Sequence, residues 1–153
     1  MPTTGYDQGQ TSISKENKHV PLPLQLEQYF FSRVTCEANP TFNPKEGSRV
    51  DFNVNVQHNL ARHEDSPCRW QLALHIQTSP ASKSMPYSIE LELVGFFLVT
   101  EEVSHPEEMI RVRGVEMLYA GARELVLGLT ARGPWFPLVL PMIDFTEPPK
   151  PAA

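Results

Sequence analysis

The sequence predicts an α+β fold in which a four-stranded antiparallel sheet is followed by a short helix and one long helix. Three observations lead to this prediction. Four segments in the first hundred residues alternate apolar and polar side chains with a period of two, as strands with one buried face do. Apolar residues after Val115 instead recur every three or four positions, as they do on a helix. Gly133 and Pro134 then end the helical pattern.

The alternating segments cover residues 50–57, 70–77 and 87–93, and an earlier one runs from about Glu27 to Ala38. Turn-prone stretches rich in Pro, Asn and Ser separate them. Alternation along the earliest segment predicts two faces, with Phe30, Val34 and Cys36 on one and Phe31, Arg33, Thr35 and Glu37 on the other. The simplest topology is a meander with one apolar and one polar face.

The helical region begins near Ser104. Ser104 and Glu107 have the spacing of a capping box, and Pro106 is tolerated in the first turn. We expect Gly114 to break this short helix before the long one begins. The long helix carries one apolar stripe, which consists of Leu118, Tyr119, Ala122, Leu125, Val126 and Leu129.

Composition divides the chain into three parts. Residues 1–24 are polar and predict a flexible arm, residues 25–146 form one domain, and residues 147–153 read as a disordered tail. The net charge of −5 disfavours nucleic-acid binding. We find no secretory signal and no apolar run long enough to span a membrane, so we expect a cytoplasmic protein without membrane contacts. Cys36 and Cys68 are expected to be reduced thiols.

The apolar content near the end of the chain exceeds what one helix on one sheet can cover. Large apolar residues beyond the helical stripe also need cover; they are Met117, Leu127, Trp135, Phe136, Leu138, Val139, Leu140 and Ile143. An exposed apolar area of this size usually marks a partner surface. We therefore expect an oligomer whose helices pack between sheets and which leaves apolar grooves for a ligand.

The end of the chain also carries a recognisable pattern. Ala122-Arg123-Glu124 is followed, after a seven-residue spacer, by Arg132-Gly133, then by an aromatic and proline pair, Leu138, Leu140, Pro141 and Phe145. Weaker similarity covers residues 36–38 and 95–97. This pattern, with the order of elements, resembles the SecB family, the tetrameric export chaperones of bacteria. The likeness spans about residues 27–145.

The resemblance implies a holdase that binds unfolded preproteins in apolar grooves beside the helix and passes them to the Sec translocation ATPase. It also implies a homotetramer built as a dimer of dimers, with no cofactor and no enzymatic activity. Expected client contacts are Trp135, Phe136, Leu138, Leu140, Phe96, Phe97 and Tyr119. Expected interface residues are Leu118, Gly121, Ala122, Arg123, Leu125, Gly128 and Leu129. Expected translocase-docking residues are Glu37, Glu90 and Glu92.

The chain departs from the family in three places. Arg33 stands where the family has an acidic docking residue, and the simple alignment places Leu91 opposite another acid. The family's C-terminal helix is also expected to be missing, because EPPKPAA follows soon after Phe145. This shortened form resembles the solitary SecB-like chaperones, some of which guard an antitoxin. A chaperone dedicated to one partner is therefore the alternative function.

Other chemistries have weaker support. His58, His63, Glu64 and Asp65 could bind zinc, but a solvated polar turn is the favoured explanation. Gly121 and Gly128 favour either close helix packing across an interface or mere tolerance of glycine. Arg123 and Glu124 either lie on a solvated face or form an ion pair at an interface or a groove edge.

Overall fold

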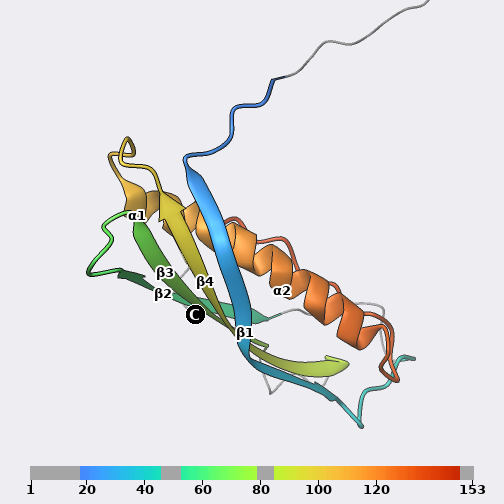
Figure 1. The fold of residues 1–153 in the computed structure, drawn as a ribbon. Coiled ribbons are helices and arrows are strands. Elements are labelled where there is room, and N and C mark those ends of the chain that lie inside the picture. Colours follow the sequence, from blue (N-terminus) through green and yellow to red (C-terminus); the bar gives the residue numbers. More distant parts are fainter. Residues whose placement is uncertain (1–17, 46–52, 79–84, 149–153) are drawn as a thin grey trace, which may run out of the picture.

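The computed structural model describes residues 18–45, 53–78 and 85–148. Its four strands precede all the helical segments, and the helices cover one face of the sheet (Figure 1). The predicted α+β class is confirmed. The elements are β1 (Leu24–Ala38), β2 (Val54–Arg62), β3 (Arg69–Thr78), β4 (Tyr87–Val99), α1 (Pro106–Met109), the π-helical η1 (Ile110–Gly114) and α2 (Val115–Thr130). Residues 50–52 of the expected second strand lie outside the described residues.

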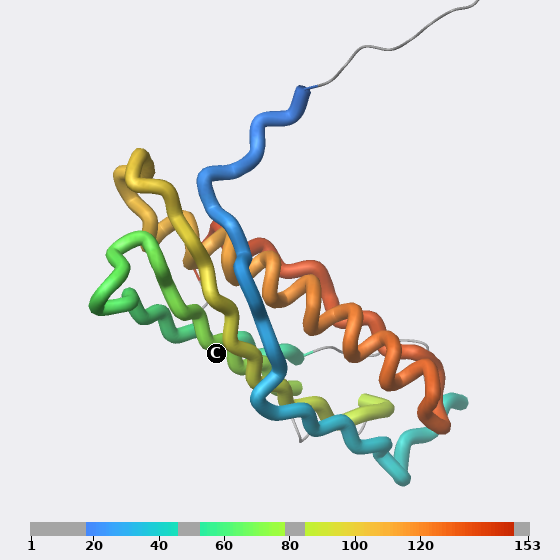
Figure 2. The backbone as a smooth tube through the Cα atoms, viewed as in Figure 1, coloured from blue at the N-terminus to red at the C-terminus, as the bar shows by residue number. Residues whose placement is uncertain are grey.

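The strand order is β1-β4-β3-β2, and all neighbours are antiparallel. The expected meander is therefore wrong for the first strand, although β2, β3 and β4 do follow one another as hairpins. β1 and β4 are the two longest strands, and they pair along nearly their whole lengths, from Leu24 with Val99 to Ala38 with Tyr87. Figure 2 traces how the chain leaves β1 and returns beside it only as β4.

Two irregularities in β1 determine which residues share a face. The register with β4 shifts between Leu26 and Gln28 and again between Phe31 and Arg33. Each extra residue reverses the alternation downstream of it. Phe31 therefore shares the inner, helix-covered face with Val34 and Cys36, and Phe30 lies on the outer face, so the faces predicted for Phe30 and Phe31 are wrong. Strict alternation failed here because a bulge leaves no plain signal in the sequence.

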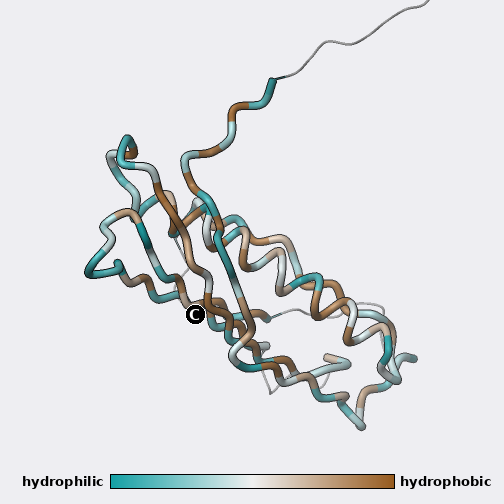
Figure 3. The backbone as a smooth tube through the Cα atoms, in the orientation of Figure 1, coloured by the Kyte–Doolittle hydropathy of each residue, from teal (hydrophilic) through white to brown (hydrophobic). Residues whose placement is uncertain are grey.

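The core lies between the inner face of the sheet and α2. β4 supplies much of it, as the apolar stretch along this strand in Figure 3 shows, and every second residue from Tyr87 to Val99 is buried. Gly95 lets the helix approach, because a Cβ at this position would lie 2.8 Å from Leu118 Cδ2. Leu118 is wholly buried as a result.

The helical segments form one continuous run from Pro106 to Thr130. Gly114 has helical angles, φ −64° and ψ −44°, so it does not break the helix as expected; the π-helical turn carries the chain through it. The predicted capping box is also wrong, because His105 is the N-cap and makes no side-chain cap bond. The predicted end is confirmed: α2 stops at Thr130, and Gly133 N–H donates to Thr130 O. Among the described residues, no helix is long and apolar enough to cross a membrane.

Candidate functional site

The segment after α2, residues 134–145, runs back along the helix as an extended strap (Figure 1). Side chains of α2 hold its backbone. Leu138 N–H donates to Thr130 Oγ1 at 2.8 Å, and Arg123 Nε donates to Leu140 O at 3.0 Å. Tyr119 Oη donates to Pro141 O at 2.5 Å. Burial raises the pKa of Tyr119 to about 12, so its hydroxyl keeps the proton that it donates.

The strap divides its apolar side chains between core and solvent. Leu138 and Leu140 are buried, whereas Phe136 is 44% exposed, Val139 51% and Met142 82%. The exposed three, with Leu127 on α2, form what we call the strap surface. Val139 and Met142 are not among the client contacts expected from the sequence. Buried and exposed side chains alternate along this segment, but it is not a strand of the sheet, so the sequence did not indicate which of its side chains face solvent.

Several expected client contacts lie inside the protomer instead. Leu138, Leu140, Phe97 and Tyr119 are all at least 96% buried, so none can touch a client without unfolding. Adjacent residues on a strand face opposite ways, which is why Phe97 is in the core while Phe96 is exposed on the outer face. Of the expected client set, Phe136 is the member that lies on the strap surface.

Trp135 links the strap to the loop after β1. Its indole N–H donates to Asn39 O at 3.1 Å, and its backbone N–H donates to Tyr87 Oη at 3.1 Å. Phe42 packs edge-on against Trp135 and Phe136, with ring centroids 5.3 and 5.6 Å away. Trp135 was expected at a groove edge. In the structure its hydrogen bonds connect the strap to the loop after β1 and to Tyr87 of β4. The sequence reasoning missed Phe42, which lies in a turn-like stretch.

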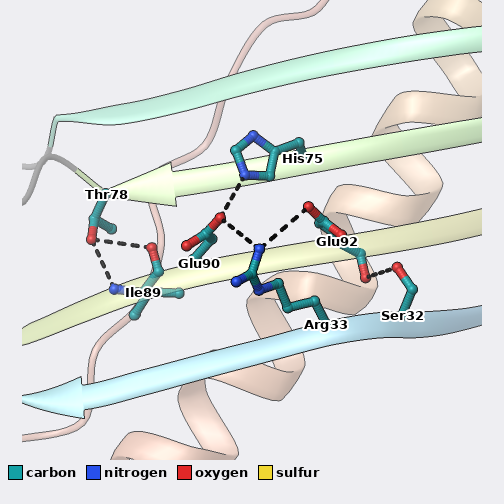
Figure 4. Close-up of polar contacts among 7 residues, drawn as sticks. All are labelled: Ser32, Arg33, His75, Thr78, Ile89, Glu90 and Glu92. Atoms are coloured by element: carbon teal, nitrogen blue, oxygen red, sulfur yellow. Dashed lines mark hydrogen bonds and ion pairs between the residues drawn. The ribbon is translucent and has the colours of Figure 1, made fainter.

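The outer face of the sheet carries a polar network (Figure 4). Arg33 Nη1 lies 3.5 Å from Glu90 Oε1 and 4.0 Å from Glu92 Oε1. His75 Nε2 lies 3.2 Å from the same Glu90 oxygen. Two of the three expected docking acids are thus paired with an arginine of their own sheet, and Glu37 is exposed. The register makes this possible, because Arg33 pairs with Glu92 across the strands.

The possible zinc residues do not converge in the turn. Among the described residues, three metal-capable side chains come within reach of one another at His75, Glu90 and Glu92, where Arg33 already supplies a cation. His58 instead lies 3.2 Å from Arg111 Nη1 through Nε2, and burial and this arginine both lower its pKa. Burial raises the pKa of the Cys36 thiol, which makes it a poor nucleophile.

The residues expected at an oligomer interface fall into two groups. Leu118 and Ala122 are fully buried by their own sheet, so they cannot lie on the protomer surface. Gly121 faces Tyr29 of β1, whose hydroxyl lies 3.0 Å from the site of a Cβ, and Arg123 holds the strap instead of pairing with Glu124. Leu125 and Leu129 are half-buried, and Gly128 has nothing within 4 Å of a Cβ, so these three remain accessible.

Comparison with protein families gives this fold an identity. A family model described as "SecB: Preprotein translocase subunit SecB" matches residues 23–147. The chain belongs to the SecB family. Family membership supports a chaperone function.

A solved SecB-like structure shares this fold at low identity. The Mycobacterium tuberculosis Rv1957 SecB-like chaperone, in complex with a ChAD peptide from the Rv1956 HigA1 antitoxin, aligns with a TM-score of 0.61 at 16% identity, over 79% of this chain and 91% of that one. A protein of unknown function from Streptococcus agalactiae aligns with a TM-score of 0.48 at 15% identity, over 80% of this chain and 100% of that one. No curated protein sequence matches the chain.

Proposed function

We propose that this SecB-family protein is a cytoplasmic holdase that binds non-native polypeptide by non-covalent contacts. The observation that carries the proposal is the strap surface. Phe136, Val139 and Met142 are exposed to solvent on a segment whose backbone is anchored to α2 by hydrogen bonds, in a protein whose family consists of chaperones. Burying apolar client side chains there gains about 25 cal/mol per Å² and requires no particular client sequence.

We also propose that the protein assembles as a homotetramer, a dimer of dimers. β1 is an edge strand of the described sheet, and Tyr29 and Val34 on its inner face are 41% and 47% exposed beside α2. Leu125, Gly128 and Leu129 offer a further accessible stripe on the helix. A second copy would cover both features, because stable homodimer interfaces bury apolar surface of this kind.

Replacing Val139 and Met142 together with aspartate should weaken capture of a reduced and alkylated, permanently unfolded protein by about tenfold or more, because two apolar contacts are lost and two charges must be desolvated. Light scattering on a sizing column measures the mass of the protein alone and with the unfolded chain. The matched control is Glu107→Asp with Glu108→Asp, two exposed positions on α1. Failure of the unaltered protein to retain any unfolded chain would refute the holdase proposal.

An export chaperone must bind the translocation ATPase through the outer face of its sheet, whereas a chaperone dedicated to one partner need not. Delivery to the Sec translocation ATPase would use Glu37, Glu90 and Glu92 as exposed anions. Arg33 lies within 4.0 Å of Glu90 and Glu92 and competes for them. This favours the second candidate, a chaperone dedicated to one partner such as an antitoxin, and the antitoxin peptide bound by the mycobacterial relative supports it.

Replacing Arg33 with glutamate tests this choice. For a dedicated chaperone, the unaltered protein should show no binding to the translocation ATPase in calorimetry, and Arg33→Glu should create measurable binding by freeing both acids and adding a third. Arg69→Glu, at another exposed outer-face arginine, controls for a mere change in net charge. Tight binding by the unaltered protein would instead favour export.

A further inference from the structure

The outer face of the sheet carries a second feature, at the end opposite the Arg33 network. A hollow of about 710 Å³ opens there. Its floor is a row of residues paired across all four strands: Gln28, Phe96, Gln71 and Ala61. It lies on the face away from α2 and the strap, so it is separate from the strap surface.

The floor of this hollow is aromatic at its centre. Phe96 is 36% exposed, and Phe30 beside it is 44% exposed, with ring centroids 6.2 Å apart. A cross-strand aromatic pair stabilises a sheet by itself. These two rings, however, leave much of their surface uncovered, and the bulge after Phe31 places Phe30 on this face. The Gln28 and Gln71 amides flank Phe96 and bond to no other described side chain or backbone group.

Some of the charged side chains around the hollow are in ion pairs or hydrogen bonds, and others are not. Arg69 Nε lies 3.6 Å from Glu27 Oε1, which neutralises that pair. Arg62 Nε donates to Pro67 O at 2.9 Å, and its guanidinium lies 5.4 Å from the centre of the Trp70 ring. Glu64 and Asp65 line the rim and form no ion pair with another described residue. Within the described part of the chain, the rim therefore presents two carboxylates and the Arg62 guanidinium outside any ion pair, a net negative charge next to an exposed aromatic floor.

We propose that this hollow is a docking site for an extended peptide segment of a partner protein, in which an aromatic residue is flanked by basic ones. The aromatic ring packs on Phe96 and Phe30. The peptide's main chain meets the Gln28 and Gln71 amides, which can both donate and accept hydrogen bonds. A lysine or arginine reaches Glu64 and Asp65. The site does not depend on the holdase proposal, since it uses the opposite face of the sheet.

The test is an NMR titration with the capped tetrapeptide Lys-Phe-Trp-Lys. Two residues report on different places: Phe96 lines the hollow on the outer face, whereas Trp135 ties the strap to the loop after β1. We expect the peptide to shift the Phe96 and Gln71 amide signals and to leave the Trp135 indole signal in place. The peptides Glu-Phe-Trp-Glu and Lys-Ser-Ser-Lys should bind at least about tenfold more weakly, since each lacks one of the two contacts.

Variants then separate the two contacts. Glu64→Gln with Asp65→Asn, on an exposed turn, should weaken Lys-Phe-Trp-Lys about fivefold and remove most of its salt dependence. Glu107→Gln with Glu108→Gln is the matched control and should change nothing. Phe96→Ser should weaken binding of the peptide further. Equal affinity for the charge-reversed peptide, shifts at Trp135 in place of Phe96, or no binding at all would each overturn the proposal.

Discussion

Replacing Leu118 with aspartate will leave no folded protomer. Leu118 is wholly buried, with its side chain packed against Gly95 of β4. An aspartate there would have no hydrogen-bond or charge partner among the described residues. Losing the leucine contacts and burying an ionisable group together cost about 5 kcal/mol or more. A typical domain is stable by only about 5–15 kcal/mol. Circular dichroism during urea titration should show an unfolded chain or a transition at much lower urea.

The control for this change is Leu127→Asp, nine residues along the same helix. Leu127 is 42% exposed, so its aspartate remains hydrated and the urea midpoint should move little. If the Leu118 variant folded normally, the helix would have to present a different face to the sheet than the one described.

Gly133→Ala should have the second largest effect. A Cβ at Gly133 would collide with the Tyr87 hydroxyl, and this hydroxyl is a junction. It accepts from Trp135 N–H at 3.1 Å and lies 3.3 Å from Thr130 O, so it connects β4, the end of α2 and the strap. Displacing it costs about 2–4 kcal/mol through overpacking and lost hydrogen bonds. Thermal unfolding should shift down by about 10 °C.

Gly128→Ala is the matched control, because a Cβ there meets nothing within 4 Å in the protomer. Alanine in a helix interior is favoured over glycine by about 0.5–1 kcal/mol, so this variant should melt higher. A stabilised but dissociated Gly128→Ala protein would place a second copy against this glycine. An unchanged melting temperature for Gly133→Ala would mean that Tyr87 is free to move aside.

The sequence predicted the elements well and their pairing less well. Periodicity identifies strands because it reflects local geometry, and the stop at Gly133 reflects a local need for glycine. Which strands pair is not local: β1 finds β4 across the whole sheet, and nothing in either segment marks the other as its neighbour. The bulge after Phe31 adds one residue to the strand, and the π-helical turn at Gly114 adds one to a helical turn. Neither can be predicted from a simple period of two or of about 3.6 residues.

The sequence predicted that the segment after α2 has an apolar surface, but it did not predict which residues form that surface. The surplus of apolar residues after α2 correctly indicated an apolar surface there, but the sequence could not divide these residues between core and solvent. That division depends on how the strap is anchored, by Thr130, Arg123 and Tyr119 from α2. Arg33 was noticed as a departure from the family, and the cross-strand register shows what it does: it pairs with Glu90 and Glu92.

The pairing of β1 with β4 has a consequence for how the chain folds as it is synthesised. β2, β3 and β4 can form their hairpins soon after each emerges, but β1 waits until residues 87–99 exist before it gains a neighbour. Contacts between residues so far apart in sequence are slow to form, because the intervening loop must first be ordered. A nascent chain of this chaperone therefore carries an unpaired, aromatic-rich strand until β4 has been synthesised, and during that time it is itself open to aggregation like any unfolded protein.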